Sequence, residues 1–151
     1  MSKIIIGVDP DSKAHGVAVY SGGKLIGCEA MPLLSVYFML IEWVNGAENI
    51  NANDVTVHME NVCGMNAVFK QRQKANQAIN MKMSNSVGKC QQSQVELERV
   101  FEYFGIKVVK HKISKMWKKD KAQFEKVTGW KGRSNEDTRS AAWFGYMGLN
   151  N

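Results

Sequence analysis

Three short apolar segments, KIIIGVDP, AHGVAVYS and KLIGCEAM, follow one another within the first 31 residues of the chain. Gly22 and Gly23 separate the second segment from the third, and a Gly-Gly pair is typical of a tight hairpin turn. The pattern predicts three strands paired as an antiparallel meander. The chain is therefore restricted to folds that contain an antiparallel sheet.

Helical and strand-like patterns alternate in the rest of the chain. Leu34, Phe38 and Ile41 have helical spacing within LLSVYFMLIEWV, and Gly105 ends the amphipathic pattern QVELERVFEYFG. The expected elements are a helix at 33–44, a strand at 54–60, a helix at 94–104, a strand at 106–113, and helices near 115–128 and 135–148. We predict one α/β domain over residues 1–151, with a five-stranded mixed sheet in which the meander is joined by parallel strands and flanked by helices.

Length and composition exclude several classes of protein. The N-terminal MSKIIIGV is too short an apolar run for a signal peptide, and PLLSVYFMLIEWV is too short to span a bilayer and contains Glu42. We expect a cytoplasmic protein without membrane contact. Cys28, Cys63 and Cys90 are widely spaced and form no CxxC pair, so we expect reduced thiols rather than disulfides or a zinc site.

Charge is distributed unevenly along the chain. Residues 1–65 hold three Lys/Arg against seven Asp/Glu, whereas residues 66–131 hold fifteen against five. Such a basic segment is typical of proteins that bind a polyanion such as a nucleic acid. A solvated basic face accounts for the charge equally well.

Three carboxylates lie at the ends of separate predicted elements. Asp9 ends the first strand, Glu60 ends the strand at 54–60, and Asp137 lies in the first turn of the last helix. Carboxylate oxygens are the ligands that Mg²⁺ prefers, and the matching chemistry is phosphodiester hydrolysis. Each residue also has a structural explanation: Asp-Pro begins turns, Glu60 can be the polar end of a strand, and SNED fits a helix cap by Ser134 and Asp137.

The order of these elements and acids resembles the ribonuclease H-like superfamily and, within it, the RuvC-type Holliday junction resolvases. Four segments that span nearly the whole chain carry the resemblance: GVDPDSKAHGVAVY, VTVHMENV, MWKKDKAQF and SNEDTRSAAWFGY. The resemblance implies that Asp9, Glu60 and Asp137 bind metal and are catalytic. It also implies that Lys118 and Lys121 contact phosphate near the reacting bond.

The resemblance further implies two Mg²⁺ ions about 4 Å apart, with Mn²⁺ as a substitute and no nucleotide cofactor. The final helix departs from the family pattern, because Ser140 stands where most relatives have a second aspartate. The Ser140 hydroxyl can hold a metal-bound water, and Glu136 or Asp11 can compensate for the missing acid. We expect the site to be active with weakened metal affinity.

Residues 61–90 are rich in Lys, Arg, Gln and Asn, a composition that suits a loop and helix facing DNA. Phe69 is predicted to stack on an unpaired base at a branch point, although packing beneath its own loop is an alternative. The phosphate contacts expected in this segment are Lys70, Arg72, Lys74, Lys82 and Lys89. His15, His58 and His111 have no ligand spacing, and we expect them to be structural or surface residues.

The function predicted from sequence is a Mg²⁺-dependent, structure-selective endonuclease that nicks four-way junctions and other branched DNA, in a bacterial cell or encoded by a phage. The family resemblance implies a homodimer, since a four-way junction has near two-fold symmetry and must be nicked symmetrically. Two alternatives stay open: a less selective debranching or RNase H-like nuclease, and a non-catalytic branched-DNA-binding protein that retains the fold.

Overall fold

The computed structural model describes residues 3–64 and 77–150 and contains a five-stranded sheet flanked by helices. The strands are β1 (Ile4–Asp9), β2 (His15–Ser21), β3 (Lys24–Met31), β4 (Val55–Glu60) and β5 (Lys107–His111). The α-helices are α1 (Leu33–Asn45), α2 (Gln77–Tyr103), α3 (Lys121–Thr128) and α4 (Glu136–Leu149), with short 3-10 turns at Ala52–Asp54 and Val62–Gly64. No helix in the described ranges is long and apolar enough to cross a membrane.

The sheet has the order β3-β2-β1-β4-β5 and confirms the predicted mixed topology. β1, β2 and β3 form the antiparallel meander, and β4 and β5 extend it in parallel with β1. Because β1 and β4 are parallel neighbours, with Val8 beside Met59, their carboxyl ends lie at the same edge of the sheet. The two acids that end these strands, Asp9 and Glu60, are therefore brought together by topology.

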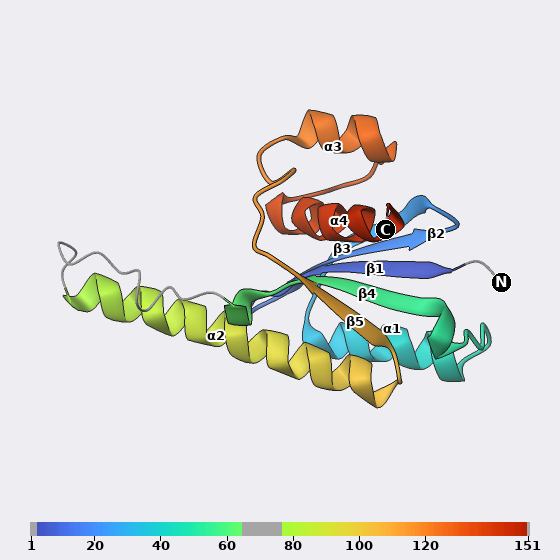
Figure 1. Ribbon diagram of the computed structural model, residues 1–151, viewed down its shortest axis with the longest axis horizontal. Coiled ribbons are helices and arrows are strands. Elements are labelled where there is room, and N and C mark those ends of the chain that lie inside the picture. Colours follow the sequence, from blue (N-terminus) through green and yellow to red (C-terminus); the bar gives the residue numbers. More distant parts are fainter. Residues whose placement is uncertain (1–2, 65–76, 151) are drawn as a thin grey trace.

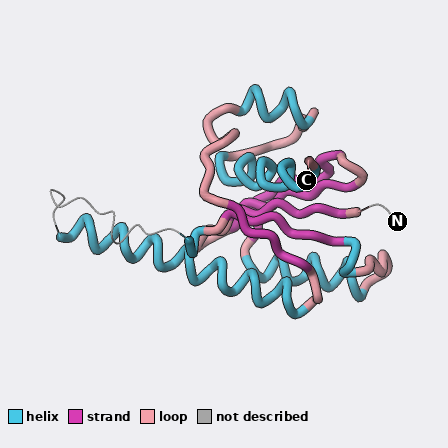
Figure 2. Tube along the Cα trace, viewed as in Figure 1, coloured by secondary structure: helices cyan, strands magenta, loops and turns pink. Residues whose placement is uncertain are grey.

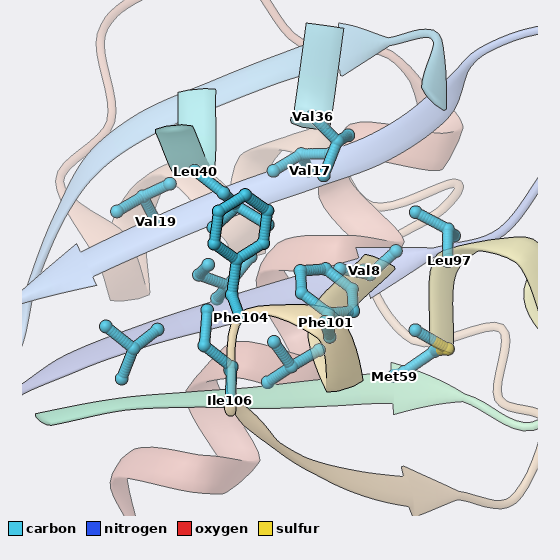
Figure 3. Close-up of a cluster of buried hydrophobic side chains, with 13 residues drawn as sticks. Val8, Val17, Val19, Val36, Leu40, Met59, Leu97, Phe101, Phe104 and Ile106 are labelled. Carbon is cyan, nitrogen blue, oxygen red and sulfur yellow. The ribbon is translucent and has the colours of Figure 1, made fainter. Parts of the chain in front are cut away.

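Helices α1 and α2 cover one face of the sheet, and α4 covers the other, with α3 outside α4 (Figure 1). Figure 2 shows the strands as a single layer between these helices. On the α1/α2 face, Val8 and Met59 of the sheet meet Leu40, Leu97 and Phe101 of the helices in a buried apolar cluster (Figure 3). This face forms the larger part of the core.

Helix α4 approaches the sheet through small residues and close backbone contacts, and a second buried cluster that includes Tyr20, Trp117 and Phe124 packs around it. A Cβ atom on Gly7 would lie 1.9 Å from the Ala141 carbonyl oxygen, so glycine is required for α4 to lie this close to β1. The Tyr20 hydroxyl donates a 2.6 Å hydrogen bond to the Ala142 carbonyl oxygen, which ties α4 to β2. The last helix is thereby fixed against the strands that carry the acids.

Two helix boundaries differ from the sequence-based prediction. α2 begins at Gln77, 17 residues before the predicted start at Gln94. Its first turns are polar and lack the apolar stripe on which the prediction depended, and Figure 1 shows this end of α2 projecting past the sheet. The helix predicted from residue 115 begins only at Lys121, because Asp120 caps it by accepting a 3.0 Å hydrogen bond from the Gln123 amide.

Candidate active site

The carboxylates of Asp9 and Glu60 lie on the α4 face of the sheet, and each residue is 5% exposed. The pleat explains their direction: Ile6, Val8, Val57 and Met59 point into the α1/α2 core, so the alternate residues point toward α4. A polar strand end in contact with water would not be buried in this way. The burial of Glu60 therefore argues against the simple strand-end explanation.

Asp137 reaches the same edge of the sheet from the first turn of α4. The helix cap is a reciprocal pair, in which Asn135 Oδ1 accepts from the Thr138 amide and Thr138 Oγ1 accepts from the Asn135 amide, both at 2.8 Å. The cap predicted at Ser134 and Asp137 is therefore wrong. Since Asn135 and Thr138 perform the capping, the Asp137 carboxylate is available for the site.

Gly16 allows the start of α4 to approach Asp9. It lies opposite Asp9 in the β1–β2 ladder, and a Cβ atom there would lie 2.1 Å from the Asp137 carbonyl oxygen. Any larger residue would push the first turn of α4 away from the sheet. The glycine in the second strand is thus part of how the acids are assembled.

Lys118 is the cation at the centre of these acids. Its Nζ lies 3.4 Å from Asp9 Oδ2 and 3.7 Å from Asp137 Oδ1, and its side chain is 27% exposed. The structure therefore brings together Asp9, Glu60, Asp137 and Lys118, which sequence analysis had selected from four separate segments. A lysine at this point can contact an anionic group as well as the carboxylates.

Burial and the neighbouring charges shift the pKa values of Glu60, Asp137 and Lys118. Burial, and then the neighbouring Asp9 carboxylate, raises the pKa of Glu60 well above its usual range. Burial and Asp9 also raise the pKa of Asp137. For Lys118, burial alone would lower the pKa, but Asp9, Glu60 and Asp137 outweigh it and raise the pKa. The cluster therefore favours a bound positive charge.

Ser140 lies one helical turn after Asp137 and is fully buried. Its Oγ has no hydrogen-bond partner in the described structure, and a buried unpaired hydroxyl is unfavourable. The residue stands where the resemblance implies an acid, and its side chain is enclosed rather than exposed to solvent. A role as a metal or water ligand stays a prediction.

Other residues predicted for the site lie outside this group. Glu136 is exposed and forms a 2.5 Å ion pair with Lys119, and Lys121 is exposed and lies 4.0 Å from Glu125. Asp11 accepts a 2.6 Å hydrogen bond from the Ser12 amide. These three side chains thus have other partners, although Asp11 and Glu136 lie close enough to Asp137 for their charges to raise its pKa.

The predicted DNA contacts lie mainly beyond the described structure. Phe69, Lys70, Arg72 and Lys74 fall outside the described residues, and Lys82 is in α2 but its side chain is not described. Lys89 is on the exposed surface of α2. The wedge and phosphate roles of this segment stay predictions.

The histidines make contacts within the fold, whereas Cys63 is exposed. His58 Nδ1 lies 2.8 Å from His111 Nε2 across β4 and β5, and burial lowers the pKa of His58 to about 4. Burial also lowers the pKa of His15, which accepts a hydrogen bond from the Asp11 amide. All three cysteines are free, as predicted.

Sequence analysis missed two buried residues that hold the site in place. Arg139 donates to the carbonyl oxygens of Trp117 at 3.0 Å and Lys118 at 2.6 Å. Gln94 donates to Asn61 Oδ1 and accepts from the Cys63 amide, which fixes the segment that follows Glu60. A polar residue such as Arg139 or Gln94 at a buried helical position indicates that it has hydrogen-bond partners. The helical spacing of the sequence does not identify which groups those partners are.

The donor set suits a hard divalent cation. Asp9 Oδ2 and Glu60 Oε2 are buried without a hydrogen-bond partner, and oxygens of this kind are the usual ligands of Mg²⁺. Within residues 3–64 and 77–150, no group of three or more His, Cys, Asp or Glu side chains is arranged as a metal site. Because the Lys118 ammonium group lies among the acids, it would have to move before a metal ion could bind there.

Comparison with solved structures identifies the fold. A Thermus thermophilus RuvC bound to a Holliday junction matches with a TM-score of 0.56 at 11% identity, over 95% of this chain and 90% of that one. A second T. thermophilus RuvC structure matches with a TM-score of 0.50 at 13% identity, over 96% of both chains. The protein therefore has the ribonuclease H-like fold of RuvC. No protein-family model and no curated protein sequence matches the chain.

Proposed function

We propose that the protein is a divalent-metal-dependent endonuclease that cuts branched DNA, with four-way junctions as the preferred substrate. The observation that carries the proposal is the group of three carboxylates from β1, β4 and α4 around Lys118, on the fold of RuvC. Two of the solved structures with this fold are RuvC, and one of them holds a Holliday junction substrate. The fold and the chemistry of the site point to the same reaction.

Asp9, Glu60 and Asp137 would hold Mg²⁺ or Mn²⁺, with two ions as the family resemblance implies. Bound there, such ions supply activation of a water nucleophile and stabilisation of the leaving oxygen. Lys118 would neutralise a non-bridging oxygen of the phosphate at the cut. Exposed lysines between β5 and α3 would bind the flanking phosphates; they are Lys112 and Lys115.

The test is cleavage of a synthetic four-way junction by the full chain in Mg²⁺ or Mn²⁺, compared with a fork and a linear duplex of the same sequences. We expect symmetric nicks in the junction and little cutting of the duplex. Junction affinity should fall steeply with salt, because phosphate contacts release counterions. Equal cutting of junction and duplex would instead identify a less selective debranching or RNase H-like nuclease.

We also propose that the active form is a homodimer, because two symmetric nicks require two active sites. The exposed apolar residues Leu34 and Phe38 on α1 and Tyr103 on α2 suit a second copy. Ring contacts through Tyr37 and Phe104 make this surface continuous. Sedimentation should show a dimer that Phe38→Glu dissociates and that Ile26→Glu, at an exposed position on β3, does not.

A non-catalytic branched-DNA-binding protein is the second candidate. Two observations favour it: Lys118 lies among the acids, and a serine stands at the expected position of a fourth acid. This candidate predicts tight junction binding with no cleavage in any divalent metal. Metal-dependent nicking that Asp9→Asn abolishes would exclude it.

A further inference from the structure

Lys118 is held at the acids chiefly by charge, and any hydrogen bond that it makes to Asp9 is long. Its ammonium nitrogen lies 3.4 Å from Asp9 Oδ2 and 3.7 Å from Asp137 Oδ1, distances longer than a charge-assisted hydrogen bond. Asp9 Oδ2 correspondingly has no hydrogen-bond partner. Another cation can therefore replace the ammonium group without breaking short, directed hydrogen bonds.

We propose that Lys118 is a tethered counter-ion that occupies the cation position of the Asp9, Glu60 and Asp137 cluster in the metal-free protein and competes with the divalent metal for it. The inference rests on the proposed metal-dependent function and deepens it by naming what controls metal occupancy. When the metal is bound, the ammonium group is released toward the phosphate of the substrate. The same residue then serves folding before substrate binding and charge neutralisation after it.

The first support is that the cluster has one described counter-ion. Within residues 3–64 and 77–150, Lys118 is the cation that pairs with Asp9 and with Asp137. Three carboxylates brought together at a largely buried sheet edge repel one another. This repulsion destabilises the folded state unless a cation is present. The lysine supplies the cation before any metal is bound.

The second support is that the backbone of Lys118 is fixed while its side chain is long and flexible. Arg139 is itself buried and donates to the carbonyl oxygens of Trp117 and Lys118 and, at 3.1 Å, to Ser134 Oγ. Trp117 adopts a φ of 66°, a left-handed conformation that a bulky residue adopts only where its surroundings impose it. The anchor is rigid, and the ammonium group can move on its four-carbon stem.

The test is the affinity of the full chain for Mn²⁺, measured by calorimetry without DNA. Removal of the competing charge by Lys118→Met should tighten Mn²⁺ binding by about fivefold or more, the factor that corresponds to two unit charges about 4 Å apart in water. Lys119→Met is the matched control, because it removes the same charge one residue away at a side chain that is 86% exposed. Lys118→Arg keeps the charge and should bind Mn²⁺ like the wild type.

A second measurement separates this role from a merely structural one. Lys118→Met should lower the melting temperature without metal, and saturating Mn²⁺ should raise it by more than it raises that of the wild type. Arg139→Lys keeps the charge of the anchor but cannot hold two carbonyl groups with one planar group. It should shift Mn²⁺ affinity in the same direction as Lys118→Met.

Unchanged or weaker Mn²⁺ binding by Lys118→Met overturns the inference, and so does a Lys118→Met chain that stays unfolded in saturating Mn²⁺. Junction cleavage by the wild type is scored separately. Tightened binding without any cleavage would overturn the proposed nuclease and leave the counter-ion role in place. Cleavage by the wild type with unchanged binding by the variant would do the reverse.

Discussion

The two faces of the sheet are built on different principles. The α1/α2 face is packed with Val, Leu, Met and Phe side chains from strands and helices (Figure 3). The α4 face has glycine and alanine along much of its contact, and it holds Asp9, Glu60, Arg139 and Ser140. The α1/α2 face therefore contains the larger apolar cluster, while the α4 side combines a smaller, aromatic cluster with charges that a protein selected only for stability would avoid.

The difference between the two faces predicts whether a substitution changes stability or activity. The same β-strands serve both faces, because successive side chains point in opposite directions. A change on the α1/α2 face should lower the free energy of unfolding and leave the activity of each folded molecule intact. A change on the α4 face should alter catalysis or metal affinity, with smaller or opposite effects on stability.

The largest effect is expected from Glu60→Gln and Asp9→Asn. Each should lower the rate of junction cleavage by about 10³-fold or more, because a ligand of the reacting centre is lost, equivalent to about 4 kcal/mol in the barrier. Junction affinity should be retained or improved, because negative charge near phosphate is removed. Rates under single-turnover conditions check this, and Glu29→Gln on exposed β3 is the control. Full activity in either variant would contradict the site.

Next is Phe101→Ala, on the other face. Phe101 is fully buried in α2, and a phenylalanine deletion in a packed core costs about 3–5 kcal/mol of the free energy of unfolding. Urea denaturation measures the loss, and Glu102→Ala, at an exposed position in the same helix, should cost far less. The cleavage rate per folded molecule should change little. A large loss of that rate would show that the two faces are not independent.

Gly16→Ala should have an intermediate effect that involves both properties. Its new Cβ would meet the Asp137 carbonyl oxygen, so the first turn of α4 must shift at a cost of about 1–3 kcal/mol. Because Asp137 moves with that turn, the Mg²⁺ concentration for half-maximal cleavage should rise. Gly27→Ala is the control, since its nearest neighbour would lie at an ordinary 3.7 Å. Loss of stability without a change in metal requirement would place Asp137 outside the site.

Ser140→Asp is expected to have the smallest effect on the cleavage rate at saturating Mg²⁺. It places a fourth carboxylate on the face of α4 that carries Asp137, so the Mg²⁺ concentration for half-maximal cleavage should fall. In the metal-free protein the added buried charge should lower the melting temperature. Ser140→Asn has a similar shape without charge and should not lower the Mg²⁺ requirement. An unchanged requirement in Ser140→Asp would mean that this position does not face the metal.

The element order, the mixed sheet and the acids at the ends of its strands follow from the pattern of residues along the chain. Alternating apolar residues identify a strand and its buried face, and the residue that ends the strand is identified with it. This is why the pattern of residues alone selects Asp9 and Glu60, and why the five-stranded arrangement is confirmed. Helical spacing likewise placed Asp137 in the first turn of α4.

Which side chains meet depends instead on how the elements pack together. Periodicity does not say where an irregular segment leads, so it could not show that Lys118 enters the acid cluster while Lys121 pairs with Glu125. It could not show that Arg139 holds the carbonyl oxygens of Trp117 and Lys118. Neighbouring positions on a helix point about 100° apart, and here that rotation places Asp137 beside Lys118 and turns Glu136 toward Lys119.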